Sequence, residues 1–347
     1  MNSGFQIIDT LQNEQNISLE NLRFLLETQD NEVLEYLKHR ARQATTAIYD
    51  NHIYIRGLIE FTNICKNDCL YCGIRKSNTN AERYRLTKED ILSCCHTGYE
   101  LGFRTFVLQG GEDGYFTDEL ICDIVTAIKK QHLDCAVTLS IGEKTLESYQ
   151  KYFDAGADRY LLRHETANEA HYQSLHPSEL SLENRKRCLK DLKDIGYQTG
   201  CGFMVSSPNQ TMATLYEDLQ FIRELQPQMV GIGPFIPHKD TPFADKPAGT
   251  LDRTLRLLSI IRLIHPHVLL PATTALGTIH PQGRELGILS GANVVMPNLS
   301  PTQVRKKYML YNDKISTREE SAEGLEDLKR RIESIGYQVV VARGDYK

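Results

Sequence analysis

The chain has 347 residues, of which 41% are hydrophobic and 24% charged, and its formal net charge is −5. This mixture is typical of a globular protein and excludes a largely disordered, collagen-like or coiled-coil chain. The weakly acidic balance gives no reason to expect a nucleic-acid partner or an anionic membrane partner. The first residues lack a basic stretch followed by an apolar one, and no run of about 18 apolar residues occurs, so we expect neither a secretory signal nor a membrane-spanning helix.

The chain then divides into a helical lead and a regular alternation. Ser18 is a suitable N-cap for a helix over 19–27, and a second helical pattern covers 31–49. Eight short apolar runs follow, at 52–61, 104–109, 135–141, 158–163, 199–205, 229–235, 268–272 and 293–298. Helical patterns separate most of them, at 87–102, 117–132, 145–156, 181–196, 211–226 and 250–265, and several begin with Ser or Thr.

Strands that alternate with helices indicate βαβ units and a parallel sheet. Eight of them predict an α/β fold of the closed (β/α)₈ TIM-barrel type, with an open doubly wound sheet as the alternative. We expect a helical lead over 1–50, a barrel over 51–300, and an extension over 301–347 packed on the barrel. Within the extension, 320–338 has a helical pattern and 339–347 is a final strand or a tail.

Nine cysteines are present, an odd number that cannot pair completely within one chain. We expect a cytoplasmic protein, and in that compartment clustered cysteines indicate a metal or catalysis rather than disulfides. Six are expected only to pack in the interior. They are Cys94, Cys95, Cys122, Cys135, Cys188 and Cys201.

The remaining three, Cys65, Cys69 and Cys72, follow the first strand directly, at the rim where barrel active sites lie. Three thiolates suit zinc, copper(I) or an iron–sulfur cluster. Structural zinc usually needs a fourth ligand, and a redox CxxC made of the last two would leave Cys65 unused. Three cysteines on a four-iron cube leave one iron open for catalysis.

CxxxCxxC with Tyr71 before the last cysteine resembles the signature of radical S-adenosylmethionine (SAM) enzymes. The resemblance implies a [4Fe–4S] cluster whose open iron binds SAM, and reductive cleavage of SAM to methionine and a 5′-deoxyadenosyl radical. A zinc site or an incidental cysteine-rich loop is the alternative.

Two further strand ends carry residues suited to ligands. Gly110 and Gly111 end the second strand, where they allow close approach of a backbone to a ligand, although GG is also a common turn. Arg163 and Glu165 end the fourth strand, either as a buried ion pair or as ligands for polar groups. Arg185 follows early in the next helix, where an isolated arginine would normally be solvated.

Seven segments, taken together and in order, resemble the HydE family of radical SAM maturases of [FeFe]-hydrogenase. They are TNICKNDCLYCGIR, FVLQGGED, DRYLLRHETAN, ENRKRCL, MVGIGPFIPHKDTP, LLPATTALGTI and GANVVMPNLSP. The resemblance implies a complete barrel with SAM at its top and a small anionic substrate in its cavity, the cysteine-bound Fe(CO)₂CN complex. It also implies an external one-electron donor, the partner maturases HydG and HydF, and a role in assembling the diiron subcluster of the hydrogenase.

The resemblance assigns roles residue by residue. Cys65, Cys69 and Cys72 match the cluster ligands. The SAM contacts match Glu165 and Arg185, with Tyr71, Gly111 and Ser140. The substrate cavity matches Gln109, Thr138, Arg163, Thr273, Thr274 and Tyr308. Without the family, Thr273 and Thr274 are equally well explained as a helix N-cap.

One departure is informative. Several members of the family carry a second cluster on three C-terminal cysteines, but no cysteine follows Cys201 in this chain. We therefore expect one [4Fe–4S] cluster and no second one. A radical SAM enzyme of amino-acid or cofactor biosynthesis, like methylornithine synthase or biotin synthase, is the second hypothesis. A non-enzymatic metal or cluster carrier is the third.

Overall fold

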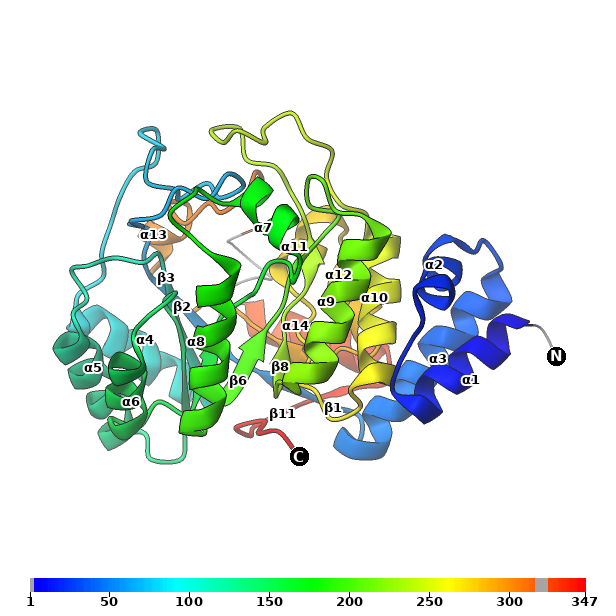
Figure 1. Ribbon diagram of the computed structural model, residues 1–347. Coiled ribbons are helices and arrows are strands. Elements are labelled where there is room, and N and C mark those ends of the chain that lie inside the picture. Colours follow the sequence, from blue (N-terminus) through cyan, green and yellow to red (C-terminus); the bar gives the residue numbers. More distant parts are fainter. Residues whose placement is uncertain (1–2, 316–323) are drawn as a thin grey trace.

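The computed structural model describes residues 3–315 and 324–347. Three helices precede the first strand and lie together on one flank of the molecule (Figure 1, blue). They are α1 (Ser3–Glu14), α2 (Leu19–Glu27) and α3 (Asn31–Tyr49). Ser18 caps α2 as expected, because its side chain accepts the N–H of Asn21 at 3.1 Å. This lead packs on the barrel mainly through α3 and α10.

Eight strand positions follow, all parallel, and they close into a barrel. Single bridges complete the ring where strands are short: Met229 to Leu269, Pro271 to Val294, and Leu58 to Asn298. The positions are β1 (His52–Ile55) with β2 (Gly57–Thr62), β3 (Thr105–Gly110), β4 (Ala136–Ser140), β5 (Arg159–Leu161), β6 (Gln198–Cys201), β8 (Met229–Val230), 269–271, and β10 (Val294–Val295). The prediction of a closed barrel is confirmed, and the open sheet is wrong.

Alternation along each strand separates the barrel interior from the layer beneath the helices. In β2, Ile59 and Phe61 belong to the main hydrophobic core, while Leu58 and Glu60 face the interior cavity. Two short strands, β7 (Met204–Val205) and β9 (Gly233–Pro234), pair with each other beyond the ends of β6 and β8. This pair extends the barrel wall beyond the carboxyl ends of β6 and β8.

All six helices predicted between strands are present. They are α4 (Lys88–Glu100), α5 (Asp118–Gln131), α6 (Leu146–Asp154), α8 (Leu182–Ile195), α9 (Met212–Leu225) and α10 (Leu251–Ile264). Each begins after a Ser or Thr whose side chain accepts a backbone N–H three residues later, a cap that stabilises a helix by about 1 kcal/mol. Three short helices were not predicted, namely α7 (Glu169–Leu175), α11 (Thr274–Ile279) and α12 (Gly283–Ile288).

After the barrel come α13 (Thr302–Arg305), α14 (Leu325–Ser334) and β11 (Gln338–Val340). The helix expected over 320–338 is present as α14, and residues 320–323 of that prediction lie outside the described residues. Strand β11 pairs in parallel with β1, and the last residues run beneath the barrel, opposite the catalytic rim (Figure 1, red).

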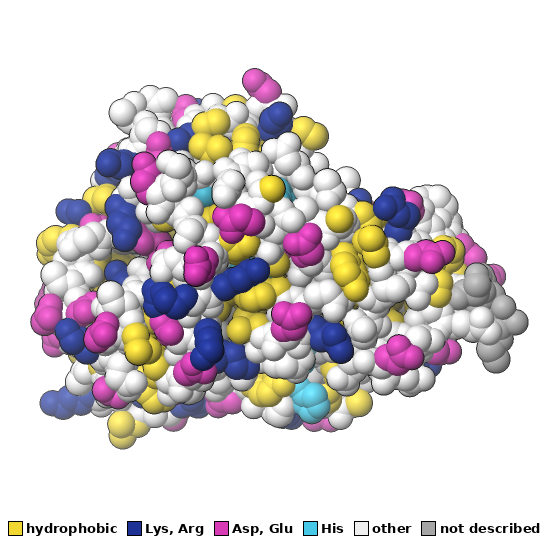
Figure 2. All heavy atoms as spheres, viewed as in Figure 1, with side chains coloured by type: hydrophobic (Ala, Val, Ile, Leu, Met, Phe, Trp, Pro, Cys, Tyr) yellow, Lys and Arg dark blue, Asp and Glu magenta, His cyan; other side chains and the backbone are white. Residues whose placement is uncertain are grey.

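Among the described residues, no helix combines the length and the apolar character needed to cross a membrane. Basic and acidic side chains are interspersed over the face shown in Figure 2. That face of the described chain therefore offers no extended patch of one charge for a nucleic acid.

Candidate active site

A cavity of about 340 Å³ opens at the carboxyl ends of the barrel strands. Its lining includes all but one of the residues that the sequence proposes for the site: Cys65, Cys69, Tyr71, Cys72, Gln109, Gly111, Ser140, Arg163, Glu165, Arg185, Thr273, Thr274 and Tyr308. Thr138 is the exception. It lies two residues before Ser140 in β4, on the same face, and its buried hydroxyl has no hydrogen-bond partner in the structure.

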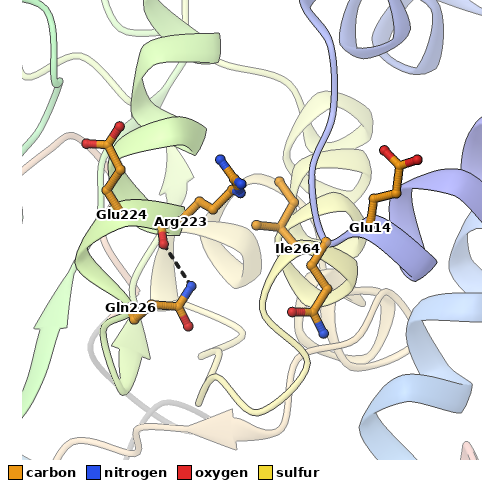
Figure 3. A pocket seen from close by; sticks show the side chains of 6 residues that line it. Glu14, Arg223, Glu224, Gln226 and Ile264 are labelled. Carbon is orange, nitrogen blue, oxygen red and sulfur yellow. Dashed lines mark hydrogen bonds between the residues drawn. The ribbon is translucent and has the colours of Figure 1, made fainter.

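A second hollow lies outside the barrel, between the end of α1 and the ends of α9 and α10 (Figure 3). Its lining is mostly polar, and Gln226 donates a hydrogen bond to the carbonyl of Arg223 at 2.8 Å. The residues that line it include no thiol and no member of the predicted site. The barrel cavity is therefore the candidate active site.

The cysteine loop and the end of β3 touch each other. The backbone N–H of Glu112 points at the Cys65 sulfur at 3.4 Å, and the N–H of Gly111 donates to the carbonyl of Thr62 at 3.1 Å. A Cβ at Gly111 would lie 2.2 Å from the carbonyl oxygen of Ile64 and 2.8 Å from the Cβ of Cys65. Glycine is required here because two backbones approach each other.

Gly111→Ala is expected to push the loop at Cys65 away from its position. Because a displacement of about 1 Å can cost about 100-fold in rate, we expect a loss of that order in SAM cleavage, together with a lower iron content. Gly114→Ala is the matched control, since a Cβ there meets nothing within 4 Å. Iron analysis and a deoxyadenosine assay measure both effects, and equal behaviour of the two variants would contradict the close approach.

Arg83 anchors the cysteine loop, and no sequence motif pointed to this residue. Its Nη1 donates to the carbonyls of Asn63 and Ile74 at 2.6 and 2.8 Å. Its Nη2 donates to those of Arg75 and Asn78 at 2.6 and 2.9 Å. One guanidinium thus satisfies four backbone acceptors of a segment that has no regular structure of its own.

The environment of the three thiols argues against a redox-active cysteine pair. Burial raises the pKa of Cys65 and of Cys69, and it raises that of Cys72 to about 12, whereas a redox-active cysteine has a lowered pKa. Soft thiolate donors suit an iron–sulfur cluster.

Tyr71 is held from behind by His176. The Tyr71 hydroxyl lies 3.1 Å from Nε2 of His176, whose Nδ1 lies 3.0 Å from the carbonyl of Tyr172. Burial lowers the pKa of His176 to about 3, so its ring is neutral at pH 7. A neutral ring that donates from Nδ1 must accept at Nε2, so the Tyr71 hydroxyl is the donor. This fixes the aromatic ring beside the last cysteine.

Arg185 is buried at the rim and not solvated. Its Nε pairs with the carboxylate of Glu143, and its Nη1 donates to the carbonyl of Arg163 at 2.8 Å. Glu143 follows β4 and was not predicted. A buried guanidinium oriented by a carboxylate and a carbonyl is well placed to bind a carboxylate of a ligand.

Arg163 and Glu165 form an ion pair with Nη2 and Oε2 3.2 Å apart, and both line the cavity. Those two buried atoms make no aligned hydrogen bond. Glu165 has a backbone φ of +64°, a strained conformation for a residue other than glycine, and its N–H donates to the carbonyl of Gly202 at 3.0 Å. The intervening His164 points away from the cavity and lies 3.5 Å from the buried Asp218.

Thr273 occupies the N-cap position of α11, but its side chain makes no capping hydrogen bond. Its buried hydroxyl has no hydrogen-bond partner in the structure and lies on the cavity wall. The explanation of Thr273 as an ordinary helix cap is therefore wrong. A free hydroxyl at this place is available to a ligand.

Comparison with known proteins agrees with this geometry. Residues 59–222 match the radical SAM superfamily. The [FeFe] hydrogenase maturase subunit HydE of Thermotoga maritima is 43% identical to this chain, over 96% of this chain and 95% of that protein. The 3-methylornithine synthase of Methanosarcina acetivorans is 27% identical, over 96% of this chain and 93% of that protein.

Solved structures share the fold. The crystal structure of methylornithine synthase (PylB) matches with a TM-score of 0.85 at 25% identity, covering 96% of this chain and 97% of that one. A crystal structure of HydG, a maturase of the [FeFe]-hydrogenase, matches with a TM-score of 0.79 at 21% identity, covering 96% of this chain and 75% of that one.

A closed barrel with three thiols at its catalytic rim, together with these matches, defines a radical SAM enzyme. Within that class, the chain belongs to the HydE family of [FeFe]-hydrogenase maturases. The non-enzymatic carrier is thereby set aside. Family membership implies a [4Fe–4S] cluster and SAM.

The residues present fit both groups. Three thiols that line one cavity are soft donors suited to iron. The close approach at Gly111, the buried oxygen of Glu165 without a hydrogen bond, and the oriented guanidinium of Arg185 provide polar contacts for an amino acid and a nucleoside.

Proposed function

We propose that this enzyme acts on a cysteine-bound Fe(CO)₂CN complex during assembly of the diiron subcluster of [FeFe]-hydrogenase. The observation that carries the proposal is the gathering of the predicted residues around one cavity, in a chain of the HydE family. When bound, the cluster and SAM supply one-electron radical chemistry that side chains alone do not perform.

Different residues of the chain then bind the cluster, SAM and the substrate. Cys65, Cys69 and Cys72 hold the cluster. SAM is held by Tyr71, Gly111, Ser140, Glu165 and Arg185. The substrate is held by Gln109, Arg163, Thr273, Thr274 and Tyr308, with Thr138 behind the cavity wall. Arg163 supplies a fixed positive charge for an anionic complex, the threonine hydroxyls donate to its ligands, and the enclosing barrel wall keeps water away.

We propose a single [4Fe–4S] cluster, because no thiol follows Cys201. The expected content is then about four irons per chain and not about eight. HydG and HydF are the proposed partners for delivery and receipt of the complex, with an external one-electron donor. The proposed setting is the cytoplasm, where thiols stay reduced.

We also propose that residues 1–50, 51–300 and 301–347 act as helical lead, barrel and extension of one enzyme. Tyr308 and Lys314 support this division of roles, because both come from the extension and line the barrel cavity. The extension would thus complete the substrate site.

Deoxyadenosine formation tests the function directly. The reconstituted enzyme with SAM and a reductant is expected to form deoxyadenosine faster by at least about tenfold when the iron–dicarbonyl–cyanide complex is added. Stimulation by a small organic substrate, with no response to the complex, would instead support amino-acid or cofactor biosynthesis. The similarity to 3-methylornithine synthase keeps that second candidate open.

A further inference from the structure

Two buried charges in the cavity are not among the residues assigned above to the cluster, SAM or the substrate. Glu60 of β2 and Lys314 of the extension both line the cavity, with side chains 0% and 5% exposed. Nζ of Lys314 lies 2.8 Å from Oε1 of Glu60. Burying such a pair costs about as much free energy as the attraction returns, so stability alone does not explain its presence.

Glu60 is the rigid member of the pair. Its Oε2 accepts from Nδ2 of Asn298 at 2.9 Å, and its N–H donates to Oγ of Ser300 at 2.8 Å. Its carbonyl accepts from the Tyr84 hydroxyl at 2.7 Å. In the sheet, Glu60 lies opposite Gln109, one of the proposed substrate contacts. The carboxylate therefore holds a fixed place beside the substrate cavity.

Lys314 makes fewer polar contacts than Glu60 in the part of the chain that the structure describes. An ammonium carries three donors, and within the described residues Glu60 is its one charged partner. Its Nζ lies 5.3 Å from the centre of the Tyr308 ring, another proposed substrate contact. Lys314 thus lies beside Glu60 and near Tyr308, one of the predicted contact residues, with donors left over for a further anion.

We propose that Lys314 binds an anionic group of the substrate, of the carboxylate class, and that Glu60 is the counter-ion that holds it in place. This inference rests on the proposed function and extends it. Because an ammonium is a compact charge with several donors, it bridges Glu60 and the substrate anion at once. The substrate is then held between Lys314 of the extension and Arg163 of the barrel.

The two members of the pair make opposite predictions. Removing the charge of Lys314 weakens binding of an anion, since the cation that attracts it is gone. Glu60→Gln keeps a side-chain oxygen that can position Lys314 but removes the negative charge that repels the same anion, so it strengthens binding. A pair that only fastens the extension to β2 predicts instead that both changes loosen the site in the same direction.

The test uses the SAM-loaded holoenzyme and the cysteine-bound Fe(CO)₂CN complex as probe, followed by its C–O and C–N infrared bands. Lys314→Met is expected to raise the Kd about 10- to 100-fold, the effect of losing a charged hydrogen bond. Lys314→Arg stays within about threefold of the wild type, and Glu60→Gln lowers the Kd about threefold or more. The change that SAM causes in the cluster's EPR signal stays the same in every variant.

The other possible outcomes contradict either the role of Lys314 or the proposed function. Unchanged binding by Lys314→Met, or parallel weakening by Lys314→Met and Glu60→Gln, contradicts the role of Lys314. If Lys314→Met does not fold, the sign of the change in Glu60→Gln decides. Failure of the wild type to bind the complex, while its EPR signal still responds to SAM, overturns the proposed function and the inference with it.

Discussion

A Cys69→Ala variant is expected to lose its iron–sulfur cluster and with it all formation of deoxyadenosine. Two thiols remain, and the buried site around them offers no replacement thiol. Iron should fall from about four per chain to well below one after anaerobic reconstitution. Iron and sulfide analysis, with the visible absorption of the cluster, measures the loss.

Cys122→Ala is the matched control for this variant. Cys122 lies on α5, packed partly against the hydrophobic core and remote from the cavity lining. Its loss should leave the iron content unchanged. Full iron occupancy in Cys69→Ala, or equal loss in both variants, would contradict the assignment of the ligands. A wild-type content of about eight irons would contradict the single cluster.

Much of the fold was predictable because its signals are local. The hydroxyl that caps each of the six helices predicted between strands lies within three residues of the N–H that it accepts, and strand alternation is visible in short runs such as 135–141. The closure of the ring was inferred from the number of runs alone. The bridges that confirm it, such as Leu58 to Asn298, join residues 240 positions apart.

The three cluster cysteines could be predicted from their spacing, whereas the SAM contacts were predicted mainly from the resemblance to the HydE family. Their supporting residues could not be found that way. Glu143 orients Arg185 across 42 positions, and His176 reaches Tyr71 across 105. In both pairs, the residues next to one partner in the sequence give no indication of the other partner. The two partners come together only in the folded chain.

The position of Glu60 in the sequence indicates a residue of the cavity, although it was not predicted as one. A carboxylate in the middle of the apolar run GLIEFT is costly to bury, and alternation turns it toward the barrel interior with Leu58. Thr138 was predicted as a cavity residue, and its side chain does not line the cavity. Alternation correctly placed Thr138 on the same face of β4 as Ser140, but alternation does not predict how far along the barrel axis the cavity extends.

At the opposite end of the barrel, the chain terminus covers a buried arginine. Arg159 of β5 is fully buried, and its Nη2 lies 2.7 Å from Oδ1 of Asp345. The same guanidinium donates to the carbonyl of Arg343 at 2.9 Å and to Oγ1 of Thr105 at 3.0 Å. Asp345 is the carboxylate that compensates this charge, and its side chain is 41% exposed.

The pKa of Asp345 gives this contact a pH dependence. Burial raises the pKa, but the hydrogen bonds from Gln198 and Arg343 and the charge of Arg159 outweigh it and lower the pKa to about 2. A carboxyl group with a lowered pKa stabilises the fold above its unfolded value of about 4, and loses that contribution as the pH falls toward 2. Asp345→Asn should therefore differ from the wild type most at neutral pH, and less with each step from about pH 4 to pH 3.

Asp345→Ala is expected to lower the free energy of unfolding by about 2 kcal/mol at pH 7, because it leaves Arg159 buried without a carboxylate. This is below the range for a fully buried pair, since water reaches the exposed side of Asp345. Glu326→Ala removes an exposed helix pair with Lys329 and should cost about 0.5 kcal/mol or less. Urea unfolding followed by circular dichroism measures both. Equal small losses in the two variants would show that the terminus merely rests on the barrel and does not neutralise its buried charge.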